Sequence, residues 1–359
     1  MHRQTENHNL VNQIFTTFFM KRAIAGLLAC FTFLVGNASD DPQQLIDING
    51  YLRFDYQHYS TDGKTNDPAS GFKGKYFLLR VDGRICENLT YSWRQRINKS
   101  AYDSSFWDAT DWAYVDYHPG RWSFQAGNQI VALGGYEYDR NPADVFGPSL
   151  FWNGIPCFQL GASAGYSVTE RDNLTVQVTQ SPFHTDENRN MYAYNLIWAA
   201  HHGFFHPRWS ANMIEYAKNR YISYIGLGNR FDVDRWALEL DLFNRAASHQ
   251  TFIGRDVSVI ANLMFSPTPR WTIFGKMSYD VNKTHRDCDY IVLPSTEMKI
   301  AGGGFEFYPL VKARHSLRLH LNCFYAWGKN TNAAEDIQNK TLMIDCGVSF
   351  KIDIFNKKH

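Results

Sequence analysis

The sequence predicts an all-β protein, a transmembrane antiparallel β-barrel of about 16 strands, and three observations support this prediction. Apolar and polar residues alternate over many segments of about 10 to 14 residues, which is the pattern of strands with two different faces. The connections between these segments are alternately short and long. Four Arg-Trp pairs each follow a short connection. These features are typical of strands that cross a membrane with one face toward lipid and the other toward an aqueous interior.

The four Arg-Trp pairs indicate where the barrel meets the membrane surface. Trp is favoured where hydrocarbon meets water, and Arg can lay its aliphatic stem on apolar surface while its guanidinium stays hydrated. We therefore expect an interfacial girdle, in contact with outer-membrane lipid, at the short-turn end of the barrel. The alternative is a soluble all-β protein whose strands begin alike. The pairs are Arg121-Trp122, Arg208-Trp209, Arg235-Trp236 and Arg270-Trp271, so the girdle residues are Trp122, Trp209, Trp236 and Trp271.

Composition agrees with a barrel better than with helical membrane spans. Charged residues make up 20% of the chain, and after the N-terminal segment no run reaches the roughly 18 apolar residues of a membrane helix. In a barrel only alternate residues meet lipid, so the mean hydropathy stays low. The net charge of +1 produces no field that would attract nucleic acid, and no nucleic-acid partner is expected.

The N-terminus is predicted to be an export signal that covers residues 1–38. Lys21 and Arg22 supply a positive region, residues 23–35 are mostly apolar, and Gly36-Asn37-Ala38 is a small-residue cleavage site. Residues before Met20 do not fit this scheme, so Met20 is an alternative start. Residues 39–359 then form the barrel.

The remaining cysteines do not indicate a disulfide framework or a zinc site, because their number is odd and their spacing irregular. Neither a metal nor a cofactor is expected. Cys323 and Cys346 lie at similar distances from the last long connection, which leaves contact between them open, although free thiols on apolar faces are favoured. The five are Cys86, Cys157, Cys288, Cys323 and Cys346.

Sixteen strands are predicted from the alternation. An even number of strands returns both termini to the same side, which is the periplasm for an outer-membrane barrel. Short turns are expected there, and longer loops outside the cell. The strands are expected to begin near residues 45, 73, 88, 108, 121, 157, 173, 190, 208, 220, 235, 254, 270, 297, 315 and 340.

The longest connection, residues 131–156, is the first candidate for a functional element. A segment this long and aromatic is costly to leave in water, so it is expected to fold into the polar interior of the barrel. Its charged residues would then project into the pore and narrow it. The alternative is an ordered external loop that touches no solute. The residues expected at the constriction are Glu137, Asp139, Arg140 and Asp144.

The inward face of the first three strands carries a predicted basic patch. On neighbouring strands the alternation stacks these side chains on one wall of the pore. Facing an acidic loop, the patch would set a transverse field that discriminates among ions. The alternative is that these arginines pair with inward acids, such as Asp55 and Asp82, as salt bridges that fill the lumen. The patch consists of Arg53, Arg80, Arg84, Arg94 and Arg96.

Other candidate sites are weaker. His201, His202 and His206 cluster in a short turn, where solvated side chains are favoured over a metal site. A barrel-borne lipase would need Ser and His with a third group that orients the His. No spacing in the sequence selects such a set, and an enzyme is not expected.

The chain resembles the phosphate-selective porin O/P-like outer-membrane porins, in the form common in Bacteroidetes, over about residues 44–355. The resemblance is strongest from Trp107 to Gln129 and in Gly134-Gly135-Tyr136-Glu137-Tyr138-Asp139-Arg140. It implies a 16-stranded barrel, a homotrimer, and a third long loop folded inward. Phosphate-selective members line that loop with Lys and Arg, whereas this loop is mainly acidic. The tail also departs, because Phe355 is followed by Asn-Lys-Lys-His.

The predicted function is that of an outer-membrane porin. It would be a passive, water-filled channel for small hydrophilic solutes or ions, with a preference for anions expected from the arginine wall. Two alternatives remain open: a barrel-borne enzyme such as an outer-membrane lipase, and a plugged structural or adhesive barrel.

Overall fold

The computed structural model describes residues 45–99, 107–284 and 288–357. The predicted export signal, 1–38, lies outside the described residues. Alternating segments form one continuous antiparallel sheet that closes on itself, because β1 (Ile46–Thr61) pairs with both β3 (Gly71–Cys86) and β17 (Thr341–Lys357). Closure leaves no unpaired edge, which is what a sheet needs in order to cross hydrocarbon.

The predicted strands are confirmed. Sixteen long strands form the barrel, and β2 (Lys64–Thr65) is a two-residue addition in the first long loop. The largest displacement of a start is three residues, at β10, which was expected at 208 and begins at 205. The others are β4 (Leu89–Arg96), β5 (Thr110–Tyr117), β6 (Trp122–Ile130), β7 (Phe158–Ser167), β8 (Asp172–Gln180), β9 (Tyr192–Ala200), β10 (Phe205–Ala217), β11 (Arg220–Val233), β12 (Trp236–Ala247), β13 (Asp256–Thr268), β14 (Trp271–Asn282), β15 (Glu297–Phe307) and β16 (Leu317–Lys329).

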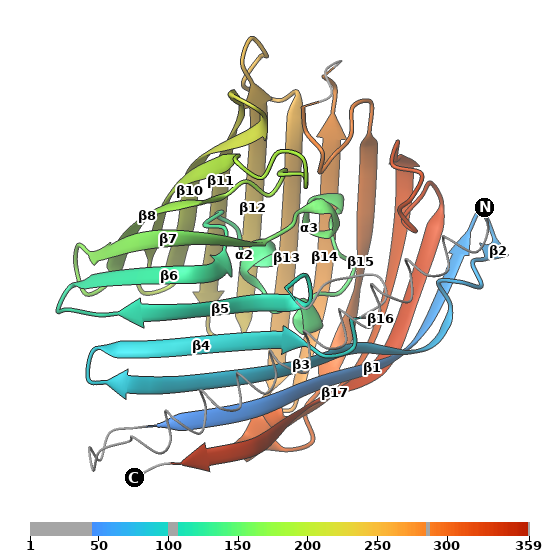
Figure 1. Ribbon diagram of the computed structural model, residues 1–359. Coiled ribbons are helices and arrows are strands. Elements are labelled where there is room, and N and C mark those ends of the chain that lie inside the picture. The colour runs from blue at the N-terminus through green and yellow to red at the C-terminus, as the bar shows by residue number, and fades with distance from the viewer. Residues whose placement is uncertain (1–44, 100–106, 285–287, 358–359) are drawn as a thin grey trace, which may run out of the picture.

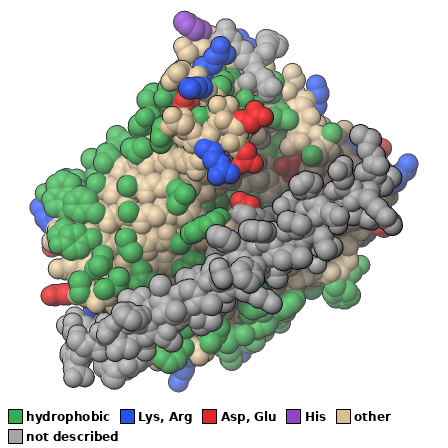
Figure 2. Space-filling view, viewed as in Figure 1, with side chains coloured by type: hydrophobic (Ala, Val, Ile, Leu, Met, Phe, Trp, Pro, Cys, Tyr) green, Lys and Arg blue, Asp and Glu red, His purple; other side chains and the backbone are tan. Residues whose placement is uncertain are grey.

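The barrel is apolar outside and polar inside, as strand β14 illustrates. Ile273 and Met277 are 51% and 61% exposed, whereas Lys276, Ser278 and Asp280 between and beyond them are buried. Figure 2 shows hydrophobic side chains gathered along the outer edges of the strands. A water-soluble protein would not leave so continuous an apolar surface uncovered. Within the described ranges, no helix has the length and apolar character needed to cross a bilayer.

The four girdle tryptophans lie near the short-turn end, and three of them occupy the first position of a strand. Trp122, Trp236 and Trp271 open β6, β12 and β14, and each packs on an aromatic ring of its own or a neighbouring strand. Trp209 differs, because β10 begins earlier, at Phe205, and places it further along the strand. Alternation then turns its partner Arg208 into the lumen instead of leaving it in the turn.

The wall of the barrel is uneven. Strands β4 to β9 have 8 to 10 residues, whereas the others have 11 to 17. The pairing of Ile46 with Lys357 places both ends of the barrel chain on the short-turn side. The longest of these turns carries η2 (Val311–Ser316).

The connection between β6 and β7 folds into the barrel, as predicted. It contains α2 (Tyr136–Asp139), η1 (Pro142–Asp144) and α3 (Leu150–Gly154), which Figure 1 shows within the ring of strands. We call residues 131–157 the inward segment. Short helical turns satisfy backbone groups that would otherwise be buried without partners.

The lumen is less polar than expected, because the inward segment brings an apolar core with it. Phe146, Phe151 and Ile155 pack among apolar side chains that point inward from β9 to β17 and from the connections around 183–191 and 288–292. The alternation of these strands therefore changes from polar to apolar on the inner face where the segment lies. One side of the lumen is therefore largely filled.

The apolar outer surface makes a direct prediction about stability. Leu263 is 44% exposed and lies near the middle of β13, at the expected centre of the bilayer. Leu263→Arg should cost about 2–4 kcal/mol in the free energy of unfolding, because an arginine would enter hydrocarbon. Urea unfolding in lipid vesicles measures this cost. Leu263→Ala is the control, and an equal loss for both variants would mean that Leu263 does not face lipid.

Candidate functional site

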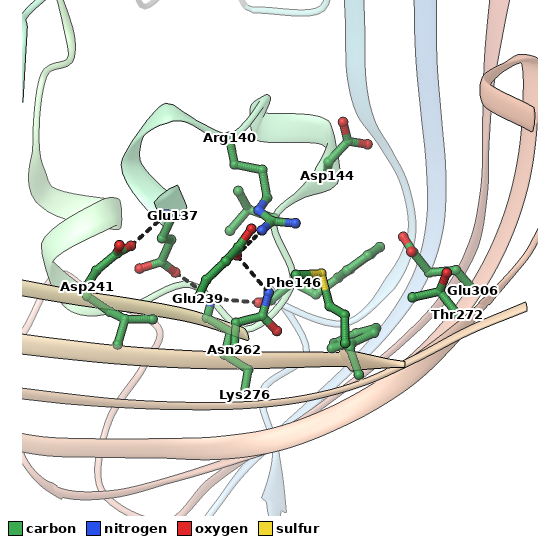
Figure 3. A pocket seen from close by; sticks show the side chains of 14 residues that line it. Glu137, Arg140, Asp144, Phe146, Glu239, Asp241, Asn262, Thr272, Lys276 and Glu306 are labelled. Atoms are coloured by element: carbon green, nitrogen blue, oxygen red, sulfur yellow. Dashed lines mark hydrogen bonds and ion pairs between the residues drawn. The ribbon is translucent and has the colours of Figure 1, made fainter. Parts of the chain in front are cut away.

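The inward segment is held against strands β12 and β14 by buried charges. Glu137 forms an ion pair with the ammonium of Lys276, and both side chains are at most 7% exposed. Glu137 also accepts hydrogen bonds from the Ser149 amide at 3.1 Å and hydroxyl at 2.6 Å, and Lys276 donates to the Phe146 carbonyl at 2.9 Å. Figure 3 shows the Glu137 side chain extending from the segment toward Lys276 on the wall. A buried pair with its remaining hydrogen bonds satisfied defines one position for the segment.

A second set of contacts fixes the start of the segment. The Asp241 carboxylate accepts the backbone N–H groups of Tyr136 and Glu137 at 2.8 Å, as a cap on the first turn of α2. Arg140 pairs with Glu239, which also accepts from Arg230 at 2.8 Å. These partners lie on β11 and β12.

The other two predicted constriction residues are also paired. Asp139 binds Arg208 at 2.7 Å, and Asp144 binds Arg318 at 2.8 Å while accepting from the Tyr51 hydroxyl at 2.9 Å. All four predicted loop charges therefore have partners on the barrel wall. These paired charges hold the segment to the wall, and Glu137, which is buried, could not remain without a partner.

The last turn of the segment is fixed in the same way. Asp280 accepts the N–H groups of Leu150 and Phe151 at 3.0 and 3.3 Å, and so caps α3. Phe151 stacks on Phe243 with centroids 4.1 Å apart. Nearby, Arg245 is fully buried between Asp256 at 2.7 Å and Asp289 at 2.9 Å, which ties the 288–296 stretch to the wall.

On the opposite side, two hollows separate the inward segment from the wall formed by β1, β3, β4 and β5. The first, the arginine hollow, measures about 400 Å³ and contains Arg80, Arg94, Arg96 and Arg140. The second, the lysine hollow, measures about 340 Å³ and contains Lys73 and Lys75. Tyr76, Trp152 and Asn153 line both hollows. The two hollows therefore adjoin at these three residues, and we call them together the open passage.

The structure brings together three of the five predicted arginines. Arg80 and Arg94 are register partners on β3 and β4, and Arg96 follows two residues later on β4. Arg80 pairs with Asp82 at 2.7 Å and Arg94 with Asp111 at 2.7 Å. Each of these arginines is therefore partly neutralised, yet the three guanidinium groups remain close together on one wall.

Arg96 is the least satisfied of the three. Its guanidinium is 3.6 Å from Asp111, beyond a hydrogen bond, and its buried Nε has no partner. An anion in the arginine hollow would supply the missing acceptor.

The other two arginines have different places. Arg53 is only 2% exposed, binds Asp55 at 2.8 Å, and donates to the carbonyls of Ala143 and Val145 at 3.1 and 3.2 Å. It therefore binds the inward segment directly while also lining the lysine hollow. Arg84 lies two residues before the short turn after β3 and lines neither hollow.

Sequence alternation missed the lysines because a β-bulge changes the phase of β3. Arg53 of β1 pairs with Tyr76, but Phe54 pairs with Gly74, so Lys75 is an extra residue in β3. A bulge redirects side chains, and here Lys73, Lys75 and Tyr76 all line the same hollow. The available signal was that Phe72-Lys-Gly-Lys-Tyr76 alternates out of phase with Arg80-Val-Asp82 in the same strand.

A second bulge lies beside the arginines. Arg94 of β4 pairs with Trp112 and Gln95 with Thr110, which leaves Asp111 as the extra residue. Trp112 then packs beneath the guanidinium groups of Arg94 at 3.7 Å and Arg80 at 5.4 Å. Cation–π contacts of this kind keep neighbouring arginines in place despite their repulsion.

Among the described residues, no disulfide joins any of the five cysteines. Cys323 and Cys346 lie on the outer surface of β16 and β17, where Leu321 is the register partner of Cys346 and Ile344 that of Cys323. Cys157 ends the inward segment beside the arginine hollow, and burial raises the pKa of its thiol to about 12. Cys157 is therefore expected to be unreactive toward thiol reagents at neutral pH.

The ion pair between Glu137 and Lys276 can be tested by stability. Glu137→Gln leaves an unpaired buried ammonium and should cost about 3–5 kcal/mol, whereas adding Lys276→Met should restore part of the loss. Samples are heated to increasing temperatures before gel electrophoresis. The temperature at which the band shifts from the mobility of the folded barrel to that of the unfolded chain measures the effect. As a control, Asp62→Asn removes the exposed pair with Lys340 and should leave that temperature unchanged. If Glu137→Gln and Asp62→Asn changed the transition temperature equally, the anchoring role of the buried pair would be contradicted.

Comparison with solved structures shows the fold. The outer membrane channel DcaP of Acinetobacter baumannii is 11% identical with a TM-score of 0.65, over 88% of this chain and 99% of that one. An anion-selective porin from Comamonas acidovorans is 9% identical with a TM-score of 0.63, over 86% and 100%. The in-vitro folded trimer form of OmpT from Vibrio cholerae is 10% identical with a TM-score of 0.57, over 86% and 100%.

A family model matches part of the sequence. No curated protein matches the chain, but the family model described as phosphate-selective porin O and P matches residues 46–204. This match runs from β1 to just beyond β9 and includes both the inward segment and the wall that faces it. The predicted resemblance is confirmed over residues 46–204, and the chain is an outer-membrane β-barrel that is similar in this part to the phosphate-selective porin O and P family.

Proposed function

We propose that the protein is an outer-membrane porin, a passive channel for small hydrophilic solutes with a preference for anions, and that solutes cross it through the open passage. One observation carries the proposal. The two hollows are lined by seven cationic side chains and only four carboxylates. The cations are Arg53, Lys73, Lys75, Arg80, Arg94, Arg96 and Arg140, and the carboxylates are Asp139, Glu335, Asp336 and Asp345.

The placement of the carboxylates strengthens this preference. Asp139, the acid of the arginine hollow, is paired with Arg208, which lies on another wall. The remaining three lie in the lysine hollow, toward the long loops. An anion moving inward therefore meets the cluster of Arg80, Arg94 and Arg96, of which Arg96 is the least compensated, where low-dielectric walls strengthen the field.

A general anion preference is favoured over selectivity for phosphate. Tight selection of phosphate requires donors that are free to surround the ion, whereas Arg80 and Arg94 each already bind a carboxylate. The family description names phosphate, but this wall offers partly neutralised arginines. Such a wall attracts anions and releases them again, which conduction requires.

The two alternatives predict different behaviour. A plugged barrel would conduct little, yet the inward segment leaves the open passage beside it. An outer-membrane lipase would hydrolyse lipid esters, and the family match and the fold both favour a channel without covalent chemistry. Export by residues 1–38 stays a prediction that is consistent with this location.

The anion preference can be tested with Arg80→Gln combined with Arg96→Gln. These two guanidiniums are the more exposed members of the cluster, at 49% and 29%, and Arg94 is retained because it neutralises buried Asp111. The reversal potential of the single channel under a salt gradient should fall to roughly half that of the unchanged protein, since the wall loses part of its field. The ohmic conductance should remain.

The matched control is Arg84→Gln, which removes an arginine of the same wall outside both hollows. It should change the reversal potential much less. The proposed passage would be contradicted by a reversal potential that indicates cation selectivity in the unchanged protein. It would also be contradicted if the double variant and Arg84→Gln changed the reversal potential equally.

We also propose that the barrel assembles as a homotrimer through the part of its wall with the shortest strands, β4 to β9. A shallow outer hollow of about 850 Å³ crosses β6 to β11, where small residues such as Ala162, Ala164 and Ala211 lie among larger apolar ones. The wall is shortest from β4 to β9, and the Vibrio OmpT barrel named above forms a trimer. A second copy would cover this apolar hollow more completely than lipid tails would.

Ala162→Trp should shift the protein from trimer to monomer, because a large ring would fill the hollow that receives the neighbouring copy. Native mass measurement in detergent reports the change. Ile273→Trp, on the outer surface of β14, is the control and should leave the trimer intact. A monomeric unchanged protein would contradict the trimer.

A further inference from the structure

The two hollows of the open passage meet at a pair of aromatic residues from opposite sides. Tyr76 belongs to the barrel wall on β3, and Trp152 belongs to α3 of the inward segment. Both line the lysine hollow and the arginine hollow, together with Asn153. A solute that moves from one hollow to the other must therefore pass these rings.

Trp152 is held rigidly in this position. Its backbone N–H donates to the Ser149 hydroxyl at 3.1 Å, and the two amides before it donate to Asp280. The preceding residue, Phe151, is 1% exposed in the apolar core. Trp152 itself is only half-buried, and among the described residues no aromatic ring or cation stacks on its indole. The ring thus presents free apolar surface to the passage.

Tyr76 owes its position to the bulge at Lys75. The bulge turns Lys75 and Tyr76 into the same hollow, although adjacent residues of a regular strand face opposite sides. The Arg96 guanidinium lies over the Tyr76 ring at 5.3 Å. A fixed cation therefore stands beside the aromatic ring on the side of the arginine hollow.

Along the open passage, cationic side chains lie on both sides of the aromatic pair Tyr76 and Trp152. Lys73 and Lys75 lie on one side of the aromatic pair, and Arg80, Arg94 and Arg96 lie on the other. Arginine and aromatic faces together bind molecules that combine an anionic group with a flat ring. A small inorganic anion gains nothing from the rings, and an uncharged aromatic lacks the ionic attraction to the lysines and arginines.

We propose that the open passage favours aromatic carboxylates, anions with a flat apolar body, and that Tyr76 and Trp152 form the specificity-determining contact. The carboxylate is attracted first by the lysines and then by the arginines, while the ring passes between the two aromatic side chains. This inference rests on the proposed function and identifies the class of solute that the same passage takes best.

Block of the single-channel current by benzoate, cyclohexanecarboxylate and acetate tests the inference. The three anions have the same charge, and the first two have similar size but differ in flatness. Benzoate should block at a roughly fivefold lower concentration than the other two, as expected for one additional aromatic contact. Trp152→Leu should remove this difference, and Tyr76→Phe should retain it because the ring remains.

Trp327→Leu is the matched control, since Trp327 lies on the exposed outer face of β16 and should leave the difference unchanged. If Trp152→Leu fails to fold, Tyr76→Leu makes the same test from the other wall. Equal block by the three anions, or a benzoate preference that survives loss of either ring, would overturn the inference. The reversal potential of the unchanged protein tests the proposed function separately, so an anion-selective channel without benzoate preference refutes only the inference.

Discussion

The buried ion pair between Glu137 and Lys276 determines where this barrel can be open. It is one member of a set of contacts, with Asp241 and Asp280 as caps, that attaches the inward segment to β12 and β14. Breaking any one of them leaves a charge or a backbone donor buried without its partner, which costs more than an exposed contact would. The segment therefore behaves as part of the wall, and the lumen beside β1, β3, β4 and β5 is what remains.

Two irregularities in the facing wall give the remaining space its chemistry. The bulges at Lys75 and Asp111 add one residue each to otherwise regular strands. The first turns a lysine and a tyrosine inward together, and the second sets Trp112 beneath two arginines. Regular strands would have sent alternate side chains to the lipid face. The anchored inward segment on one side and the two bulged strands on the other thus enclose a narrow, positively charged passage.

Strand positions, closure and the inward course of residues 131–156 could be predicted from the sequence, because alternation and loop length are local properties. The partners of the segment could not. Glu137 and Asp144 were interpreted as pore charges, whereas Lys276 and Arg318 neutralise them from strands more than a hundred residues away. Alternation placed Arg80, Arg94 and Arg96 on one wall correctly. It missed Lys75, because a bulge changes the phase without leaving a strong pattern in one sequence.

The location of the passage is the central claim, and thiol modification during single-channel recording tests it most directly. Lys75→Cys places a thiol in the lysine hollow, and a bulky charged thiol reagent should then lower the conductance stepwise. The unchanged protein treated with the same reagent is the control, because it carries the same five cysteines and lacks only the thiol at position 75. A conductance that persists after complete modification at position 75 would contradict the account, since solutes would then cross by another route.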